Sequence, residues 1–170
     1  MGEIQPDIAW RGKELSWRVY NRSIEHALSH DRYRRLSRIV SIVGALLAAT
    51  AGASVLANLT GDWAKVVASL GFLSALLATM EPVLGYAKQA EAHRVAGSSF
   101  GALGTPYYNL QYLDREQQVK GLQELTLQQE RLEKESVNVE QWAIEKREKN
   151  ERRKRELKEP RKRKSRGVFT

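Results

Sequence analysis

Two histidines four residues apart are the residues best spaced for metal chemistry in this sequence. His26 and His30 would lie on one face of a helix, where both imidazoles could reach one metal ion. A tetrahedral site needs further ligands, and the chain has no cysteine and no HExxH motif. We therefore expect two exposed histidines, with no metal site and no cofactor. Because no nucleophile, base and oxyanion donor are grouped either, we expect no enzyme activity.

Glu81 is a second candidate for chemistry, because it is the one ionisable residue inside a long apolar segment. Such residues in membrane proteins commonly mark ion or proton pathways. However, a helix that starts at Val66 would place Glu81 about 22 Å along its axis, near headgroup water. A solvated carboxylate, helped by Lys88 further along the helix, is therefore the alternative to a functional one. Pro82 lacks a backbone N–H, so we expect a kink or hinge there.

Two apolar segments in the middle of the chain determine the expected fold class. Residues 39–59 contain no charged side chain, and residues 66–87 contain only Glu81. A helix of 21 residues is about 31 Å long, which matches the ~30 Å hydrocarbon core of a bilayer. Core helices of soluble proteins usually have apolar runs of only about 10–14 residues. We therefore predict an all-α membrane protein, in which residues 60–65 form the external turn of a two-helix transmembrane hairpin.

The positions of the basic residues predict the orientation of this hairpin. Four arginines precede the first span and two basic residues follow the second, whereas the turn contains only Lys65. Basic residues are enriched on the cytoplasmic side of membrane proteins. Both termini of this multi-pass membrane protein should therefore be cytoplasmic, and the resemblance described below implies the inner (plasma) membrane.

The segments outside the spans read as cytoplasmic helices. Residues 1–38 should form a helix that is continuous with the first span, with one apolar stripe through Trp17, Tyr20 and Ile24. Within residues 88–159, we expect one helix to end at Gly104-Thr105-Pro106 and a second to begin near Tyr107. Gly97, Gly101 and Gly104 lack the lysine of a phosphate-binding loop, so they should instead allow close packing against the N-terminal helix.

The second of these helices should extend to about Glu159 with weak coiled-coil character. Pro160 should end it, which leaves residues 160–170 as a disordered basic tail. On a cytoplasmic membrane face, anionic lipid is the nearest partner for such a tail. A tail without a specific partner is the alternative, and nucleic acid is less favoured. The candidate lipid-binding residues are Arg161, Lys162, Arg163, Lys164 and Arg166.

Small residues recur at four-residue spacing in both spans. Gly44, Ala48 and Gly52 form a row in the first span, and Gly71 and Ala75 begin one in the second. Small side chains let two helices approach closely enough for dispersion to drive their association in lipid. One interpretation is packing inside the hairpin. The other is a homo-oligomer, in which one small face contacts a neighbouring subunit.

The layout of the chain resembles that of the SLATT family. The resemblance lies in a cytoplasmic helix ending in HDRYRRLSR, a short two-span hairpin and a following helix with AEAHRVAGSSFGAL, over roughly residues 13 to 125. The positions that support it are Tyr33, Arg35, Ala92, His93, Arg94, Gly97 and Phe100. Members are two-transmembrane effector modules of prokaryotic conflict systems. The resemblance therefore implies a non-enzymatic effector that oligomerises and permeabilises the inner membrane when a nucleotide-signalling or sensor partner is triggered.

Two other functions fit the same layout. A membrane-anchored scaffold would use its C-terminal helices to bind partners and would leave the bilayer intact. A holin-like phage protein can also have two spans and a basic tail, although its cytoplasmic arms are usually shorter. The effector hypothesis additionally assigns His93 and Arg94 as candidate functional residues, beside Glu81 and Pro82.

Overall fold

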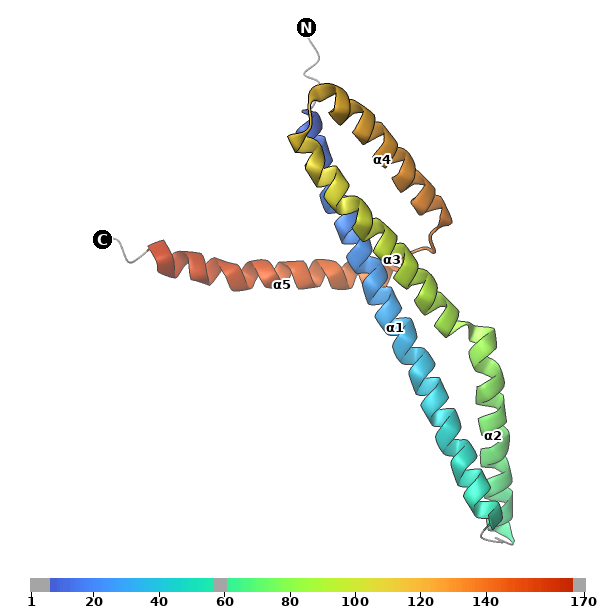
Figure 1. Ribbon diagram of the computed structural model, residues 1–170. Helices are drawn as coiled ribbons and strands as arrows, with labels where there is room; N and C mark the ends of the chain where they lie inside the picture. Colours follow the sequence, from blue (N-terminus) through green and yellow to red (C-terminus); the bar gives the residue numbers. More distant parts are fainter. Residues whose placement is uncertain (1–6, 57–60, 167–170) are drawn as a thin grey trace. The chain divides into compact units, whose positions relative to one another are not determined.

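The computed structural model describes residues 7–56 and 61–166 (Figure 1). The described residues are helical apart from short connections, and no strand occurs among them. The helices are α1 (Ile8–Leu56), α2 (Asp62–Leu84), α3 (Tyr86–Asn109), the 3-10 helix η1 (Leu110–Tyr112), α4 (Arg115–Glu135) and α5 (Gln141–Arg166). The predicted all-helical fold is confirmed.

The chain divides into two compact units, to which both α1 and α3 contribute. The polar unit consists of residues 1–29 and 93–170, and the apolar unit consists of residues 30–92. As predicted, α1 continues without a break from the N-terminal segment into the first apolar segment. No proline or cap interrupts the backbone hydrogen bonds between them.

The apolar unit contains two helices that are long and apolar enough to cross a membrane. In the most apolar 18-residue stretch of each helix, only 0% and 6% of the residues are buried. The two helices touch through small residues: a Cβ at Gly71 would lie 3.6 Å from that of Ala51, and one at Gly44 would lie 3.9 Å from that of Leu77. Most large apolar side chains therefore point outward rather than into a protein core.

The helical segment is interrupted at Gly85, and the kink predicted at Pro82 stays a prediction. Pro82 lies inside α2, which begins at Asp62 and ends at Leu84, four residues before the predicted start and three before the predicted end of the span of residues 66–87. Gly85 has φ of +63°, the left-handed conformation that glycine adopts after a helix C-terminus. Glycine adopts this conformation without a steric clash because it has no Cβ atom, so the chain leaves the helix at Gly85.

Three predicted boundaries outside the apolar segments were wrong. α3 does not end at Gly104-Thr105-Pro106 but continues through Pro106 to Asn109. One helix was predicted from Tyr107 to Glu159, but residues 136–140 separate α4 from α5. Asp114 caps α4, because its carboxylate accepts a hydrogen bond of 2.9 Å from the Gln117 N–H. Local capping and packing therefore outweighed the proline and glycine signals.

The third wrong boundary concerns the basic tail, because α5 continues through position 160 to Arg166. We predicted a disordered segment from Pro160 onward. One proline removes a single backbone hydrogen bond, and the surrounding lysines, arginines and glutamates are good helix formers. The helical backbone therefore extends beyond the proline.

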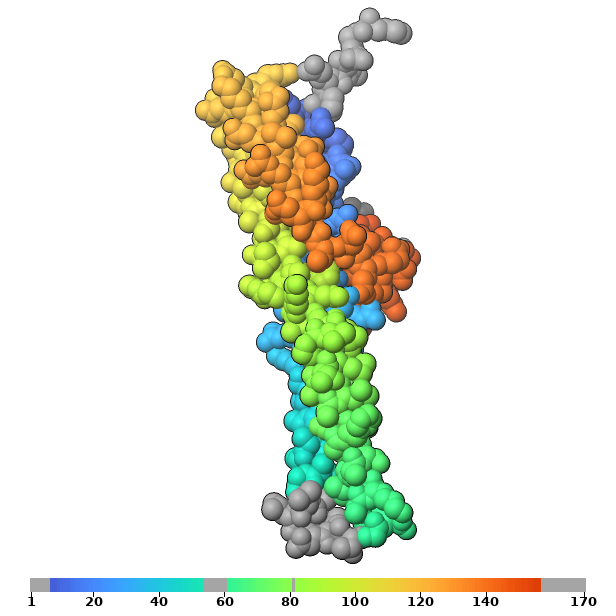
Figure 2. Space-filling model, turned by 90° about the vertical axis from the view of Figure 1, so that its right-hand side faces the viewer, coloured from blue at the N-terminus to red at the C-terminus, as the bar shows by residue number. Residues whose placement is uncertain are grey.

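The core of the polar unit is formed by α1, α3, η1 and α4. Its buried residues are Val19, Phe100, Leu103, Tyr107, Leu110 and Leu125. The glycines of α3 approach α1 as predicted, since a Cβ at Gly97 would lie 3.2 Å from the Cβ of His26. α4 (orange) lies over α3 in the space-filling view (Figure 2). The Tyr107 hydroxyl of α3 donates a 3.0 Å hydrogen bond to the Gln129 side chain of α4. Leu125 of α4 belongs to this core, and Leu122 and Leu132 pack against it.

Candidate functional site

A buried pair of histidines occupies the contact between α1 and α3 in the polar unit. His26 is 1% exposed and His93 is 2% exposed, and their Nδ1 atoms lie 3.0 Å apart. The His26 ring also stacks on Phe100, with centroids 5.4 Å apart. The N···N separation suits one hydrogen bond, in which one neutral imidazole donates and the other accepts. The pair therefore requires at least one uncharged ring.

The sequence had suggested a different histidine pair. His26 and His30 were expected to be exposed neighbours, but a nitrogen of His30 instead contacts the Ala90 carbonyl oxygen at 2.9 Å, within the apolar unit. The correction for His26 follows from Gly97, whose missing side chain lets α3 approach the His26 side of α1. Among the described residues, no group of three potential ligands gathers around a metal position.

Two residues of the predicted apolar stripe of α1 are not buried. Trp17 and Tyr20 are about half exposed, whereas Val19, Glu25, His26 and Ser29 are buried. Helical periodicity finds residues that share a face, but it does not decide which face is covered. The glycines on α3 decide it here, because they fit against the side of α1 that contains His26.

Burial depresses the basicity of His26. Its pKa falls from the ordinary 6.5 to about 4, first because burial removes water from the charged form, and then because His93 and Arg22 lie close by. At neutral pH the ring is therefore uncharged. It can then take part in the N–H···N contact with His93.

This depressed pKa predicts an acid-sensitive polar unit. Between pH 6.5 and about 4, the unfolded chain binds a proton at His26 that the folded chain does not bind. Stability should therefore fall as the pH is lowered through this window, by at most about 3 kcal/mol from this residue. Unfolding of the full chain in mild detergent at several pH values measures the slope. His26→Gln removes the titrating group, so equal slopes for wild type and variant between pH 6.5 and 5 would contradict the prediction.

A buried carboxylate next to the histidines links α1 to α5. Glu25 is 5% exposed, and its carboxylate forms ion pairs with Arg147 Nε at 3.1 Å and with Arg22 at 3.3 Å. Arg147 also lies 3.7 Å from Glu151 on its own helix. Beside it, Ala143 is completely buried. We call Glu25, Arg22 and Arg147 the Glu25 cluster. It attaches the first turns of α5 to the polar unit.

Sequence reasoning missed the Glu25 cluster. Arg22 and Glu25 have ordinary three-residue helical spacing, which also occurs on exposed helix faces. Arg147 lies on another helix, far along the sequence, in a region that reads only as a charged segment. No local sequence pattern distinguishes Arg147, which is largely buried, from the other charged residues of α5.

The predicted small-residue row of the first span has one residue that faces α2 and two that are exposed. Gly44 faces α2, where its carbonyl oxygen accepts a 2.9 Å hydrogen bond from the Ser74 hydroxyl. Ala48 and Gly52 are exposed, and nothing lies within 4 Å of a Cβ built at Gly52. On α2, Gly71 contacts α1 while Ala75 is exposed. Packing between α1 and α2 thus accounts for part of the row and leaves an outward part.

The remaining predicted residues are not brought together into one site. His93 belongs to the buried pair, whereas Arg94 and Pro82 are exposed. The side chain of Glu81 lies outside the described residues. The same holds for the side chains of the basic set, Arg161, Lys162, Arg163, Lys164 and Arg166, for which only the helical backbone is described. Their roles stay predictions.

Comparisons with known proteins do not assign the chain to a group. No protein-family model, curated protein or solved structure matches it. The resemblance to the SLATT family thus depends on the residues quoted above. The function has to be argued from the chemistry of the two units.

Proposed function

We propose that this chain is a membrane protein in which α1 and α2 form a two-helix transmembrane hairpin. The observation that carries the proposal is the outward-facing apolar surface of both helices, where Phe72 is 72% exposed and Val83 is 85% exposed. Leaving one large apolar side chain in water instead of burying it costs about 1.5–3 kcal/mol. Soluble monomers rarely expose apolar patches beyond a few hundred Å². Lipid covers such a surface without a protein partner.

The polar side chains of the same helices support a lipid environment. The hydroxyls of Thr50, Ser69, Ser74 and Thr79 each donate a hydrogen bond to a backbone carbonyl, at 2.8–2.9 Å. A bilayer core offers no water to polar groups, so an unsatisfied hydroxyl there is costly. These serines and threonines are therefore compatible with burial in hydrocarbon.

Within the membrane, we propose that the chain acts as an effector that oligomerises and permeabilises the inner membrane in a prokaryotic defence system. The resemblance to the SLATT family supports this role, together with the outward small residues Ala48 and Gly52. Two helices cannot enclose a water-filled path, so permeabilisation requires several subunits. A nucleotide-signalling or sensor protein is the expected trigger, and anionic lipid is the expected partner of the basic end of α5.

A membrane-anchored scaffold is the alternative function. It is favoured by the large aromatic side chains that the polar unit exposes, such as Trp17, Tyr20 and Tyr112. Exposed tryptophan and tyrosine are enriched at protein–protein contacts. A scaffold would bind partners through such residues and would not alter the bilayer.

Cysteine labelling tests the proposed topology directly, because the natural chain has no cysteine. With both termini cytoplasmic, Gly61→Cys should react with a membrane-impermeant maleimide added to intact cells. Gln128→Cys, on an exposed position of α4, should react only after the cells are opened. Labelling of both variants only in opened cells, or extraction of the protein by carbonate without detergent, would contradict a hairpin of this orientation.

Dye entry and membrane potential after induced expression separate the two functions. The effector proposal predicts uptake of a membrane-impermeant dye and loss of potential. The scaffold predicts no change in either quantity while the protein is still inserted. Normal insertion without leakage, in cells that also contain the triggering system, would therefore favour the scaffold.

A further inference from the structure

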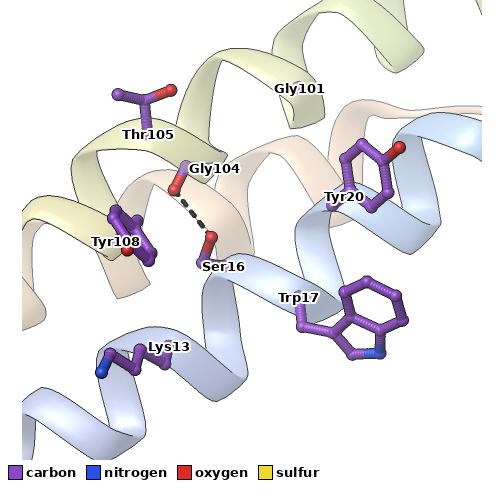
Figure 3. A pocket seen from close by; sticks show the side chains of 8 residues that line it. All are labelled: Lys13, Ser16, Trp17, Tyr20, Gly101, Gly104, Thr105 and Tyr108. Carbon is purple, nitrogen blue, oxygen red and sulfur yellow. Dashed lines mark hydrogen bonds between the residues drawn. The ribbon is translucent and has the colours of Figure 1, made fainter. Parts of the chain in front are cut away.

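An open groove of about 570 Å³ lies between α1 and α3 in the polar unit (Figure 3). Its floor is made of small residues, since Gly101 and Gly104 come from α3 and Ser16 comes from α1. The Ser16 hydroxyl donates a 2.9 Å hydrogen bond to the Gly104 carbonyl oxygen, so these two polar groups of the floor satisfy each other. With these two groups paired, the floor presents a ligand with few free hydrogen-bonding groups.

Aromatic rings form the walls of the groove. Trp17 and Tyr20 have ring centroids 5.9 Å apart on α1, and Tyr108 comes from α3. Trp17 is 52% exposed and Tyr20 is 53% exposed. Half-exposed rings of this size can still bury a large apolar area against a ligand, at a low cost in side-chain entropy. The chemistry of the walls favours a flat ring.

One side of the groove is cationic. Lys13 lines it, and its charge helps to lower the pKa of Tyr108, after the larger effect of hydrogen bonds from Gln111 and Tyr112. None of the described residues that line the groove is acidic. A cationic ligand would meet Lys13 with no carboxylate to offset it, whereas an anion would gain a charged partner.

We propose that this groove binds a small organic anion with a flat ring system. The ring lies over Gly101 and Gly104 against Trp17 and Tyr20, and the acidic group pairs with the Lys13 ammonium. The volume of the groove falls in the ~300–1,000 Å³ range of small-molecule sites. The site belongs to the polar unit alone, so it does not depend on the proposed membrane activity.

Naphthalene-1-sulfonate is a suitable probe, because it combines a flat ring with a fixed negative charge. We expect saturable binding to the full chain in nanodiscs by calorimetry, after subtraction of empty nanodiscs, with a dissociation constant of about 0.1–1 mM. Lys13→Gln should weaken binding about tenfold, and Trp17→Leu should weaken it several-fold. The neutral analogue naphthalene-1-methanol should bind equally to wild type and Lys13→Gln.

A matched pair of bulky substitutions on α3 locates the site. Thr105 lines the groove, so Thr105→Phe should fill the space and abolish binding. Ala102 is exposed on the same helix and does not line the groove, so Ala102→Phe should bind like wild type. Absence of saturable binding, or equal affinity in these two variants, would overturn the site. Unchanged affinity in Lys13→Gln would overturn the assignment of an anion.

Discussion

Glu25→Gln is expected to destabilise the polar unit, by at most about 3 kcal/mol, and to loosen α5. The change removes the negative charge that lies 3.1 Å from Arg147 and 3.3 Å from Arg22. Breaking a buried ion pair by removing one partner leaves the other charge desolvated, and Arg147 would keep only its longer contacts with Glu148 at 3.6 Å and Glu151 at 3.7 Å. Here two guanidinium groups would remain close together. Denaturation in mild detergent gives the loss in free energy, and amide hydrogen exchange shows whether residues 141–151 become less protected than α3.

Glu14→Gln is the matched control for this substitution. Glu14 forms an ion pair with Arg18 on the same helix, but the two side chains are 36% and 65% exposed. Exposed pairs contribute only about 0–1 kcal/mol, so this variant should behave nearly like wild type. The double variant Glu25→Gln, Arg147→Gln should recover part of the lost stability, because the guanidinium that lost its closest carboxylate is gone. Equal effects of Glu25→Gln and Glu14→Gln would show that the Glu25 cluster does not hold α5.

The apolar helices were predictable from the sequence because their signal is local. The thickness of the bilayer's hydrocarbon core determines how many consecutive apolar residues a span needs. Residues 39–59 meet that number, and this can be read without knowing what they contact. The close approach of α3 to α1 was predictable for a similar reason. Gly97, Gly101 and Gly104 lie on one helix face, and a row of glycines lets the backbone of a neighbouring helix come close.

The buried polar residues were not predictable, because tertiary packing decides their burial. Trp17 and Tyr20 belong to the predicted apolar stripe and are half exposed, whereas His26 was expected to be exposed and is buried, as is Glu25. Each buried polar group depends on a partner elsewhere in the chain, Arg147 for Glu25 and His93 for His26. Periodicity carries no information about such partners. Scales of charge and hydrophobicity alone would place Glu25 and His26 at the surface and Trp17 and Tyr20 in the core.

Helix ends were the least predictable feature of the backbone, for a physical reason that Pro82 and Pro106 illustrate. Both prolines lie inside helices, and the helices end instead before Gly85 and before the extended Leu113. Proline weakens a helix by a finite amount, about 3 kcal/mol, and packing of the flanking turns can offset it. Tyr107 and Leu110, which are fully or almost fully buried, hold the turn that follows Pro106.

Ala48→Leu and Gly52→Leu are expected to reduce oligomer formation and membrane leakage together. The structure makes these positions informative, because both are exposed and a Cβ at Gly52 meets nothing within 4 Å. At Gly52, added volume leaves the contact between α1 and α2 intact and acts only on what approaches from outside. Ala48 also lines a hollow of about 340 Å³ together with Ser74 and Leu77 of α2, so the pairing of α1 with α2 has to be checked separately in Ala48→Leu. Overpacking a close helix contact typically costs ~1–3 kcal/mol. Crosslinking yield and dye entry measure the two effects in the same cells.

Ala49→Leu and Gly44→Leu separate this contact from simpler causes. Ala49 is exposed and lies outside the predicted row of Gly44, Ala48 and Gly52, so Ala49→Leu should change neither quantity. Gly44 faces Leu77, so Gly44→Leu should disturb the pairing of α1 with α2 and lower the amount of inserted protein. Normal insertion with unchanged crosslinking and leakage in Ala48→Leu and Gly52→Leu would mean that lipid alone covers this surface. The oligomeric effector would then lose its structural support, and the scaffold would become the better explanation of the chain.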